Sequence, residues 1–262
     1  MGRTVYLFTL ALLISLNVQA GVILHEGTYQ GKNLYVLNPF AGSGVGFCTF
    51  EVTVNDEITT DELNSSAFEI DFTALQIELG GKVEVKIKHK DDCTPKVMNP
   101  EVLKPKSTYV ISSIKVDKGG VLRWTTNGES GELPFTIEQF RWNKWIKLGQ
   151  VDGKGTTVSH NYSFKVAPHS GENKYRVKQV DFSRKPRYSP NATFNSPTPN
   201  ISFTPLKVNK EIIFTSSTMY EIFDQYGNLV KKGADTQINV SNLKKGIYYL
   251  NFDNQMESFV KK

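Results

Sequence analysis

The stretch Thr218–Lys262 reads TMYEIFDQYGNLVKKGADTQINVSNLKKGIYYLNFDNQMESFVKK. Tyr220 and Ile222 open a strand in which apolar and polar residues alternate. Gly227 lies in the turn sequence that follows, where a glycine can take a positive φ at little cost. The run Ile247–Phe252 is rich in β-branched and aromatic residues, which favour strands. The stretch therefore predicts a small domain built from β-hairpins.

The order of small motifs in this stretch resembles the type A C-terminal sorting domain of the type IX secretion system, found in Bacteroidota. The resemblance covers Leu206–Lys262. It rests on Asp224, Gly227, Ser241, Leu243, Gly246, Tyr248, Lys261 and Lys262. It implies recognition by an outer-membrane translocon, usually followed by removal of the tail by a sorting-domain peptidase. A terminal β-sandwich without a sorting role is the alternative, because motif matches produce false positives.

The N-terminus has the features of a secretory signal peptide. Met1–Arg3 is short and basic, Val5–Val18 is mostly apolar, and Val18-Gln19-Ala20 provides small residues around a cleavage site. The apolar run is too short to span a bilayer comfortably, and no other stretch of the chain qualifies. We therefore expect residues 1–20 to be removed. Together with the tail, this predicts a protein that is secreted or held on the outer-membrane surface of a diderm bacterium, by way of the periplasm.

Composition places the chain among ordinary globular proteins. Charged residues make up 22% of the 262 residues and hydrophobic residues 39%. The formal net charge of +5 is a mild excess that is spread along the chain. Nucleic-acid binding would require a concentrated basic face, so we do not expect a nucleic-acid partner. In no long stretch do apolar residues recur with the 3.6-residue period of a helix. This favours an all-β protein.

The chain has two cysteines, Cys48 and Cys93. An exported chain meets an oxidising compartment, so a single disulfide between them is the natural interpretation. By closing a loop, the bridge would stabilise the folded chain by about 4 kcal/mol in the chain-entropy model.

Alternating strands divide the rest of the chain into modules. Residues 21–111 contain half-buried patterns such as Val83, Val85 and Ile87 alternating with charged residues, and predict a β-sandwich with one disulfide. Residues 112–190 repeat strand signals roughly every ten residues, which is typical of an immunoglobulin-like sandwich. Residues 191–205 hold several prolines and predict a linker. The fold prediction is thus three consecutive small antiparallel β-sandwich domains, the third being 206–262.

The second module also resembles a bacterial fibronectin type III domain. The residues that carry this resemblance are Leu122 with Trp124, Phe135 with Ile137 and Glu138, the run Tyr175–Asp181, and Tyr188 with Ser189. The resemblance implies that Trp124 and Tyr175 are core residues.

The cluster His89-Lys90-Asp91-Asp92-Cys93 is the best local candidate for chemistry. Zinc needs three or four converging ligands, and the spacings that usually supply them are missing here. A thiol beside His89 could act as a nucleophile, but a disulfide would remove it. The carboxylate pairs Asp61-Glu62 and Asp91-Asp92 lack the fixed separation that glycoside hydrolysis requires. We therefore predict no catalytic residue, no metal site and no cofactor, with a small secreted hydrolase near His89–Cys93 as an alternative.

Trp142 and Trp145 flank two polar residues. If both indoles were exposed, they could stack against sugar rings, since aromatic side chains offer flat apolar area with a polar edge. The leading prediction is a non-catalytic secreted or surface protein that binds or scaffolds. The runner-up is a carbohydrate-binding or adhesive module that uses this tryptophan pair, with a surface polysaccharide or protein as its ligand.

Overall fold

The computed structural model describes residues 21–262, so the predicted signal peptide lies outside the described residues. The chain divides into two compact units, Met1–Lys104 and Pro105–Lys262. The secondary structure of residues 21–262 is almost entirely β, with one short 3-10 helix and no α-helix. None of the helical segments in that part is long and apolar enough to cross a membrane.

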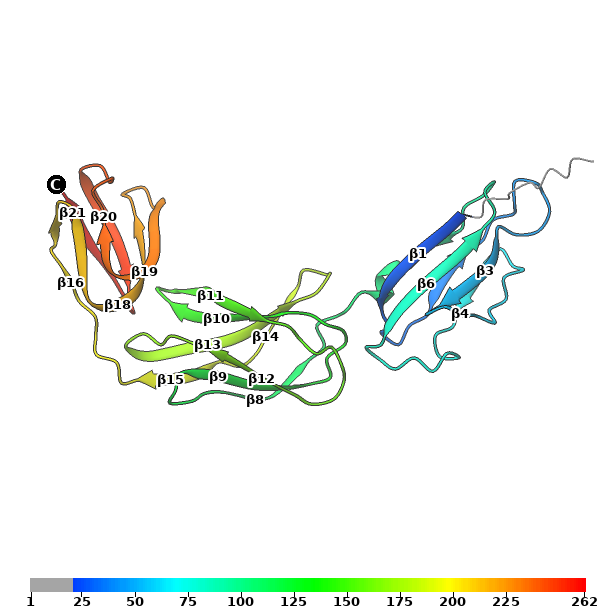
Figure 1. Ribbon diagram of the computed structural model, residues 1–262, viewed down its shortest axis with the longest axis horizontal. Coiled ribbons are helices and arrows are strands. Elements are labelled where there is room, and N and C mark those ends of the chain that lie inside the picture. The colour runs from blue at the N-terminus through cyan, green and yellow to red at the C-terminus, as the bar shows by residue number, and fades with distance from the viewer. Residues whose placement is uncertain (1–20) are drawn as a thin grey trace, which may run out of the picture. The chain divides into compact units, whose positions relative to one another are not determined.

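The first unit is built from two antiparallel sheets (Figure 1). One sheet has the order β1 (Gly21–Thr28), β6 (Lys82–His89), β3 (Thr49–Val54) and β4 (Glu57–Ile58). The other has the order β5 (Ala67–Ile70), β2 (Leu34–Leu37) and β7 (Lys96–Val97), followed by the 3-10 helix η1 (Pro100–Leu103).

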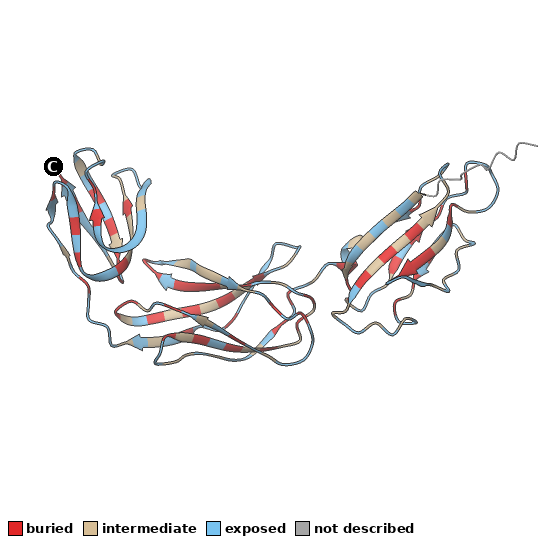
Figure 2. Cartoon of the chain, in the orientation of Figure 1, coloured by how far each residue is buried: buried red, intermediate tan, exposed pale blue. Residues whose placement is uncertain are grey.

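The alternation in the sequence decides which side of each strand is buried in this unit. In β6, Val83, Val85 and Ile87 are at most 3% exposed, while the lysines and glutamate between them lie on the other face. Figure 2 shows the same alternation of buried and exposed residues along the strands. Because successive side chains of a strand point to opposite faces, one face of each sheet packs into a shared core. The largest fully buried side chain in that core is Phe72.

The second unit contains a β-sandwich and, after it, a smaller β domain. The sandwich pairs a sheet of β11 (Lys144–Val151), β10 (Phe135–Arg141), β13 (Gly171–Val180), β14 (Pro186–Tyr188) and β15 (Ala192–Ser196) with a sheet of β12 (His160–Lys165), β9 (Val121–Asn127) and β8 (Val110–Val116). Trp124 is 1% exposed and stacks on Tyr162, and Tyr175 is fully buried. Both are core residues, as the fibronectin resemblance implied.

The smaller domain has one six-stranded sheet. Its strands are β16 (Phe203–Thr204), β17 (Lys207–Val208), β18 (Glu211–Phe223), β19 (Leu229–Asn239), β20 (Gly246–Phe252) and β21 (Gln255–Lys261). The pairing is antiparallel except between β17 and β21, which run parallel. Its core contains Ile222, Leu250, Phe252 and Phe259, each at most 1% exposed.

The observed boundaries differ from the sequence-based ones at two places. The first unit ends at Lys104, and β8 begins at Val110, inside the range that we expected to end the first module. Residues 191–205 are not a linker throughout, because β15 pairs with β13 as part of the sandwich and β16 pairs with β18. Prolines flank both strands without interrupting them, which is how a short edge strand accommodates proline. Residues 197–200 remain outside any strand and are exposed.

Candidate functional site

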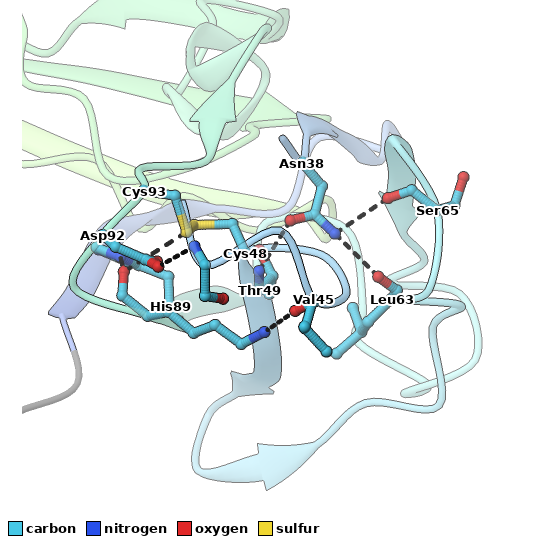
Figure 3. The surroundings of a disulfide bond; sticks show 11 residues. Asn38, Val45, Cys48, Thr49, Leu63, Ser65, His89, Asp92 and Cys93 are labelled. Atoms are coloured by element: carbon cyan, nitrogen blue, oxygen red, sulfur yellow. Dashed lines mark hydrogen bonds between the residues drawn. A yellow bond between two sulfur atoms is a disulfide. The ribbon is translucent and has the colours of Figure 1, made fainter. Parts of the chain in front are cut away.

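The disulfide corner of the first unit is structural (Figure 3). Cys48 and Cys93 are bonded with an S–S distance of 2.08 Å, which confirms the predicted bridge. Side chains of the polar cluster around the bridge bond to nearby backbone groups. Asp92 Oδ2 accepts a hydrogen bond from the Ser43 backbone N–H at 2.7 Å. The ring of His89 contacts the Lys90 carbonyl oxygen through Nδ1 at 2.9 Å.

The disulfide removes the thiol nucleophile that the hydrolase alternative could have used. Both cysteines of the chain are in the bridge, so a thiolate nucleophile near His89 is not available. Within residues 21–262 the structure brings together no group of three or more His, Cys, Asp or Glu side chains that could hold a metal ion. The glycine-rich stretch before Cys48 forms turns, with the Lys90 ammonium donating to the Val45 carbonyl oxygen at 2.8 Å.

A buried carboxylate in the sandwich has a structural explanation as well. Glu138 on β10 accepts hydrogen bonds from Arg176 and Lys178, both at 2.7 Å. Burial alone would raise the pKa of the Glu138 carboxyl, but the hydrogen bonds from Lys178 and Arg176 outweigh it and hold the pKa below its usual range. A carboxylate that is held ionised by two cations cannot donate a proton, so Glu138 is not suited to act as a general acid.

The tryptophan pair does not form the platform that the sequence suggested. Trp142 is 7% exposed, and its indole N–H donates to the Phe252 carbonyl oxygen of the smaller domain at 3.3 Å. Trp145 is half-buried, and the Arg176 guanidinium lies 3.9 Å from the centre of its ring. The condition that both indoles be exposed therefore fails. The reason is that Trp142 occupies the tip of the β10–β11 hairpin, with a φ of 53°, and its ring is covered by another domain.

The first unit has an open groove that sequence reasoning missed. A hollow of about 580 Å³ is lined by Tyr29, Gly31, Lys32, Asn33, Tyr35, Glu69, Thr73, Asn99, Glu101 and Val102. A second hollow of about 270 Å³ continues it over β2 and β5 and shares Tyr35 and Glu69 with the first. We call the two together the Tyr35 groove.

The polar groups of the Tyr35 groove are held in place by one another. Tyr35 is 53% exposed and lies directly opposite Glu69 in the β2–β5 register. The charge of Glu69 and a hydrogen bond to it raise the pKa of the Tyr35 hydroxyl. The Asn33 amide donates to Glu69 at 2.8 Å, and Asn99 accepts the Tyr35 backbone N–H at 2.8 Å. The groove thus presents an exposed aromatic ring with amide and carboxylate groups fixed beside it.

The sequence of β2 contains a signal for this groove. Tyr35 and Leu37 are the outward residues of β2 and are 53% and 45% exposed, whereas a half-buried strand would normally place polar side chains there. Asn33 and Asn99 are 66 positions apart, so their meeting could not be read from spacing.

In the smaller domain, most residues of the sorting motif build the fold. Asp224 turns the chain between β18 and β19 by accepting the backbone N–H groups of Tyr226 and Asn228, both at 2.9 Å. Hydrogen bonds from the Asn228 side chain and backbone lower the pKa of Asp224. Gly227 adopts a φ of 81° in that turn, in the left-handed region that glycine enters freely.

The second half of the motif is divided between core and surface. Tyr248 is 7% exposed, stacks on Phe259, and donates its hydroxyl to the Lys244 carbonyl oxygen at 3.0 Å. Leu243 packs partly against the core. Lys261 is 8% exposed at the end of β21. Ser241 and Lys262 are exposed, and Gly246 begins β20. The motif therefore specifies this fold, and the exposed residues of the domain are the ones available to a partner.

Comparison with known proteins identifies this domain. Residues 197–262 match the family described as "Secretion system C-terminal sorting domain". The match begins at Pro197, directly after β15, and thus includes residues that we had expected to be linker. A domain of this family indicates export to the cell surface or the medium and interaction with the type IX secretion machinery. No curated protein matches the chain at a significant level.

Solved structures show distant similarities. A tetra-tandem repeat from the extending region of a large adhesion protein matches with a TM-score of 0.33 and 11% identity, covering 93% of this chain and 73% of that chain. Fibronectin(III)-like modules of Clostridium thermocellum CbhA match with a TM-score of 0.22 and 13% identity, covering 59% of this chain and 94% of that chain. Salmonella alpha-2-macroglobulin matches with a TM-score of 0.26 and 8% identity, over 92% of this chain and 22% of that chain. TM-scores this low say nothing about function.

Proposed function

We propose that this chain is a non-catalytic binding protein that the type IX secretion system exports across the outer membrane of a diderm bacterium. The observation that carries the proposal is the sorting domain at residues 197–262, folded as a complete six-stranded sheet. Residues 197–262 are the export signal, and the two preceding sandwiches are the cargo. The tail is recognised by the translocon and removed by its peptidase, after which the cargo is released or attached to the surface.

Export depends on the sorting domain, which a truncation tests. A chain that ends at Ser196 keeps β15 and therefore leaves the sandwich intact. We expect the full chain to reach the surface or the medium and the truncated chain to remain in the periplasm, because the outer-membrane translocon has nothing to recognise. The measurement is cell fractionation with immunoblotting, in a strain with type IX secretion and in one that lacks the translocon.

A periplasmic reporter fused to residues 190–262 is the matched control, and it should follow the full chain outward. Equal amounts of full and truncated chain in the medium would contradict the proposal.

The Tyr35 groove favours a second, finer function, the binding of an oligosaccharide. Protein sites for sugars combine a flat aromatic ring for the apolar face of the sugar with fixed polar groups for its hydroxyls, and this groove has both. It takes the place of the tryptophan pair as the carbohydrate-binding surface. Glu69 and Asn33 lie beside the exposed ring of Tyr35, where they can accept and donate hydrogen bonds to a sugar.

Replacement of Tyr35 tests this function. In isothermal titration with a panel of soluble neutral oligosaccharides, we expect Tyr35→Ala to weaken binding several-fold, up to about tenfold, in line with aromatic stacking worth about 0.5–1.5 kcal/mol. Tyr35→Phe keeps the ring and should lose much less. Phe50→Ala removes a similarly exposed ring, 48% exposed on β3, and should have no effect. Binding that is unchanged in Tyr35→Ala, or missing in the unaltered chain, would refute the sugar-binding function.

A further inference from the structure

Two hairpin turns meet within the unit that spans Pro105–Lys262. One is the turn of the sandwich at Trp142–Asn143, between β10 and β11, where both residues have positive φ values of 53° and 57°. The other is the turn of the sorting domain at Asp253–Asn254, between β20 and β21. The indole N–H of Trp142 donates to the Phe252 carbonyl oxygen at 3.3 Å. The contact therefore joins an aromatic side chain of the sandwich to the backbone of the sorting domain.

Asp253 makes the densest part of this contact. It is 1% exposed, and its Oδ1 accepts the backbone N–H of Ser170 at 2.9 Å. Its Oδ2 accepts the Ser170 hydroxyl. The neighbouring Asn254 side chain donates to the Ser170 carbonyl oxygen at 3.0 Å. Ser170 is fully buried. Its backbone N–H, hydroxyl and carbonyl each form a hydrogen bond with the sorting domain. Such hydrogen bonds to a buried carboxylate are among the stronger ones in proteins.

The edge of the contact is more exposed. The Lys144 ammonium lies 2.6 Å from the Glu221 carboxylate, with the two side chains 45% and 16% exposed. It also lies 5.5 Å from the centre of the Phe223 ring. An ion pair that exposed contributes little, so the buried groups around Asp253 and Trp142 carry most of the binding.

The covalent connection between the two domains borders this contact: Thr198 lines a small hollow together with His169 and Asp253, and the Ile201 backbone N–H donates to Asp253 Oδ2 at 3.3 Å. Residues 197–200 are exposed and belong to no strand. Cutting the chain there would leave every hydrogen bond between Ser170 and Asp253 in place. The hydrogen bonds of Ser170 to Asp253 and Asn254 involve no residue of 197–200.

We propose that the sorting domain, residues 197–262, stays bound to the sandwich, residues 105–196, after the connecting segment has been cut. Removal of the tail is then two steps, cleavage of a peptide bond and dissociation of a docked domain. What this continued binding means for export rests on the proposed function. The binding itself does not depend on that function. The surface formed by Trp142 and Ser170 is thus a docking site whose occupant is the chain's own tail.

An engineered cut tests the proposal in the full chain. A recognition sequence for a site-specific protease is inserted between Pro199 and Asn200, and the folded protein is cut to completion. We expect the two fragments to elute together in size-exclusion chromatography at about 1 µM, the range of a moderately tight complex. Fragments that separate at that concentration would overturn the proposal. The experiment requires no secretion machinery, so its outcome is independent of whether the truncated chain is exported.

Two substitutions on opposite sides of the contact sharpen the test. Trp142→Asn removes the ring, and asparagine tolerates the positive φ of this position. Asp253→Asn keeps the shape of the side chain but replaces one acceptor oxygen by a donor. Each should weaken the fragment complex by roughly thirtyfold, the size expected when a buried hot-spot residue is lost.

Trp145→Ala is the matched control, because this tryptophan is on the same hairpin but packs on Arg176 of its own domain. It should leave the complex unchanged. Circular dichroism of each variant shows whether both domains remain folded. If Asp253→Asn disturbs the sorting domain itself, Trp142→Asn on the sandwich side decides the question. A folded Trp142→Asn chain whose fragments bind as tightly as the unaltered ones would refute the proposed interface.

Discussion

Replacing Trp124 by alanine should destabilise the sandwich by about 3–5 kcal/mol, the usual cost of truncating a large buried aromatic side chain. Trp124 is 1% exposed, and its ring stacks on Tyr162 at 5.3 Å between centroids and meets Phe135 edge-on at 6.0 Å. Its removal leaves a cavity between both sheets of the sandwich. Since whole domains are stable by about 5–15 kcal/mol, the loss would bring this one close to unfolding. Hydrogen exchange in urea, read from peptides of β9, β12 and β13, measures the effect in the sandwich alone.

Trp124→Phe should cost much less than Trp124→Ala. The indole Nε1 of Trp124 is buried without a hydrogen-bond partner among the described residues, so phenylalanine removes a buried polar group as well as apolar volume. Trp145→Ala, on a half-buried ring of the same sandwich, should stay within about 1 kcal/mol. A Trp124→Ala loss that is no larger than the Trp145→Ala loss would show that Trp124 is not the centre of this core.

Removing the disulfide with Cys48→Ala and Cys93→Ala together should cost the first unit about 4 kcal/mol in the chain-entropy model. The two cysteines are 45 positions apart, so the bridge removes many conformations from the unfolded chain. For a domain of this size the loss corresponds to a fall in Tm of roughly 16–32 °C. Scanning calorimetry of the full chain would show it as a shift of one transition.

The transition of the second unit is the internal control for the disulfide experiment, because that unit contains no cysteine. It should not move. Replacing both cysteines avoids leaving a single free thiol that could pair between molecules. If the transition of the first unit also stayed in place, the bridge would be unimportant for its stability.

Much of the fold could be predicted because strand patterns are local. Val83, Val85 and Ile87 alternate with charged residues in the sequence, and they are buried on one face of β6. The disulfide could be predicted because two cysteines allow one intramolecular pairing. The end of the sandwich was misplaced because β15 is short, exposed on alternate residues and surrounded by prolines, so its sequence also suits a linker.

The candidate sites were less predictable, because burial by another domain is not written into a local pattern. Trp142 and Trp145 look equivalent in the sequence, three positions apart on one hairpin. The structure separates them, since Trp142 is covered by the sorting domain and Trp145 by Arg176. The Tyr35 groove depends on Asn33 and Asn99 coming together, which follows from how the first unit packs.

By itself, the sequence determined the strand period, the turns at Asp224 and Gly227, the pairing of the cysteines and the identity of the sorting domain. Most of these features depend on residues that are close in the chain and on interactions between neighbours. The cysteine pairing depends only on there being two cysteines. The tertiary structure alone decided that Ser170 and Asp253, 83 positions apart, share buried hydrogen bonds. Such contacts depend on which surfaces of two folded domains are complementary, and that is settled only when every strand of both is in place.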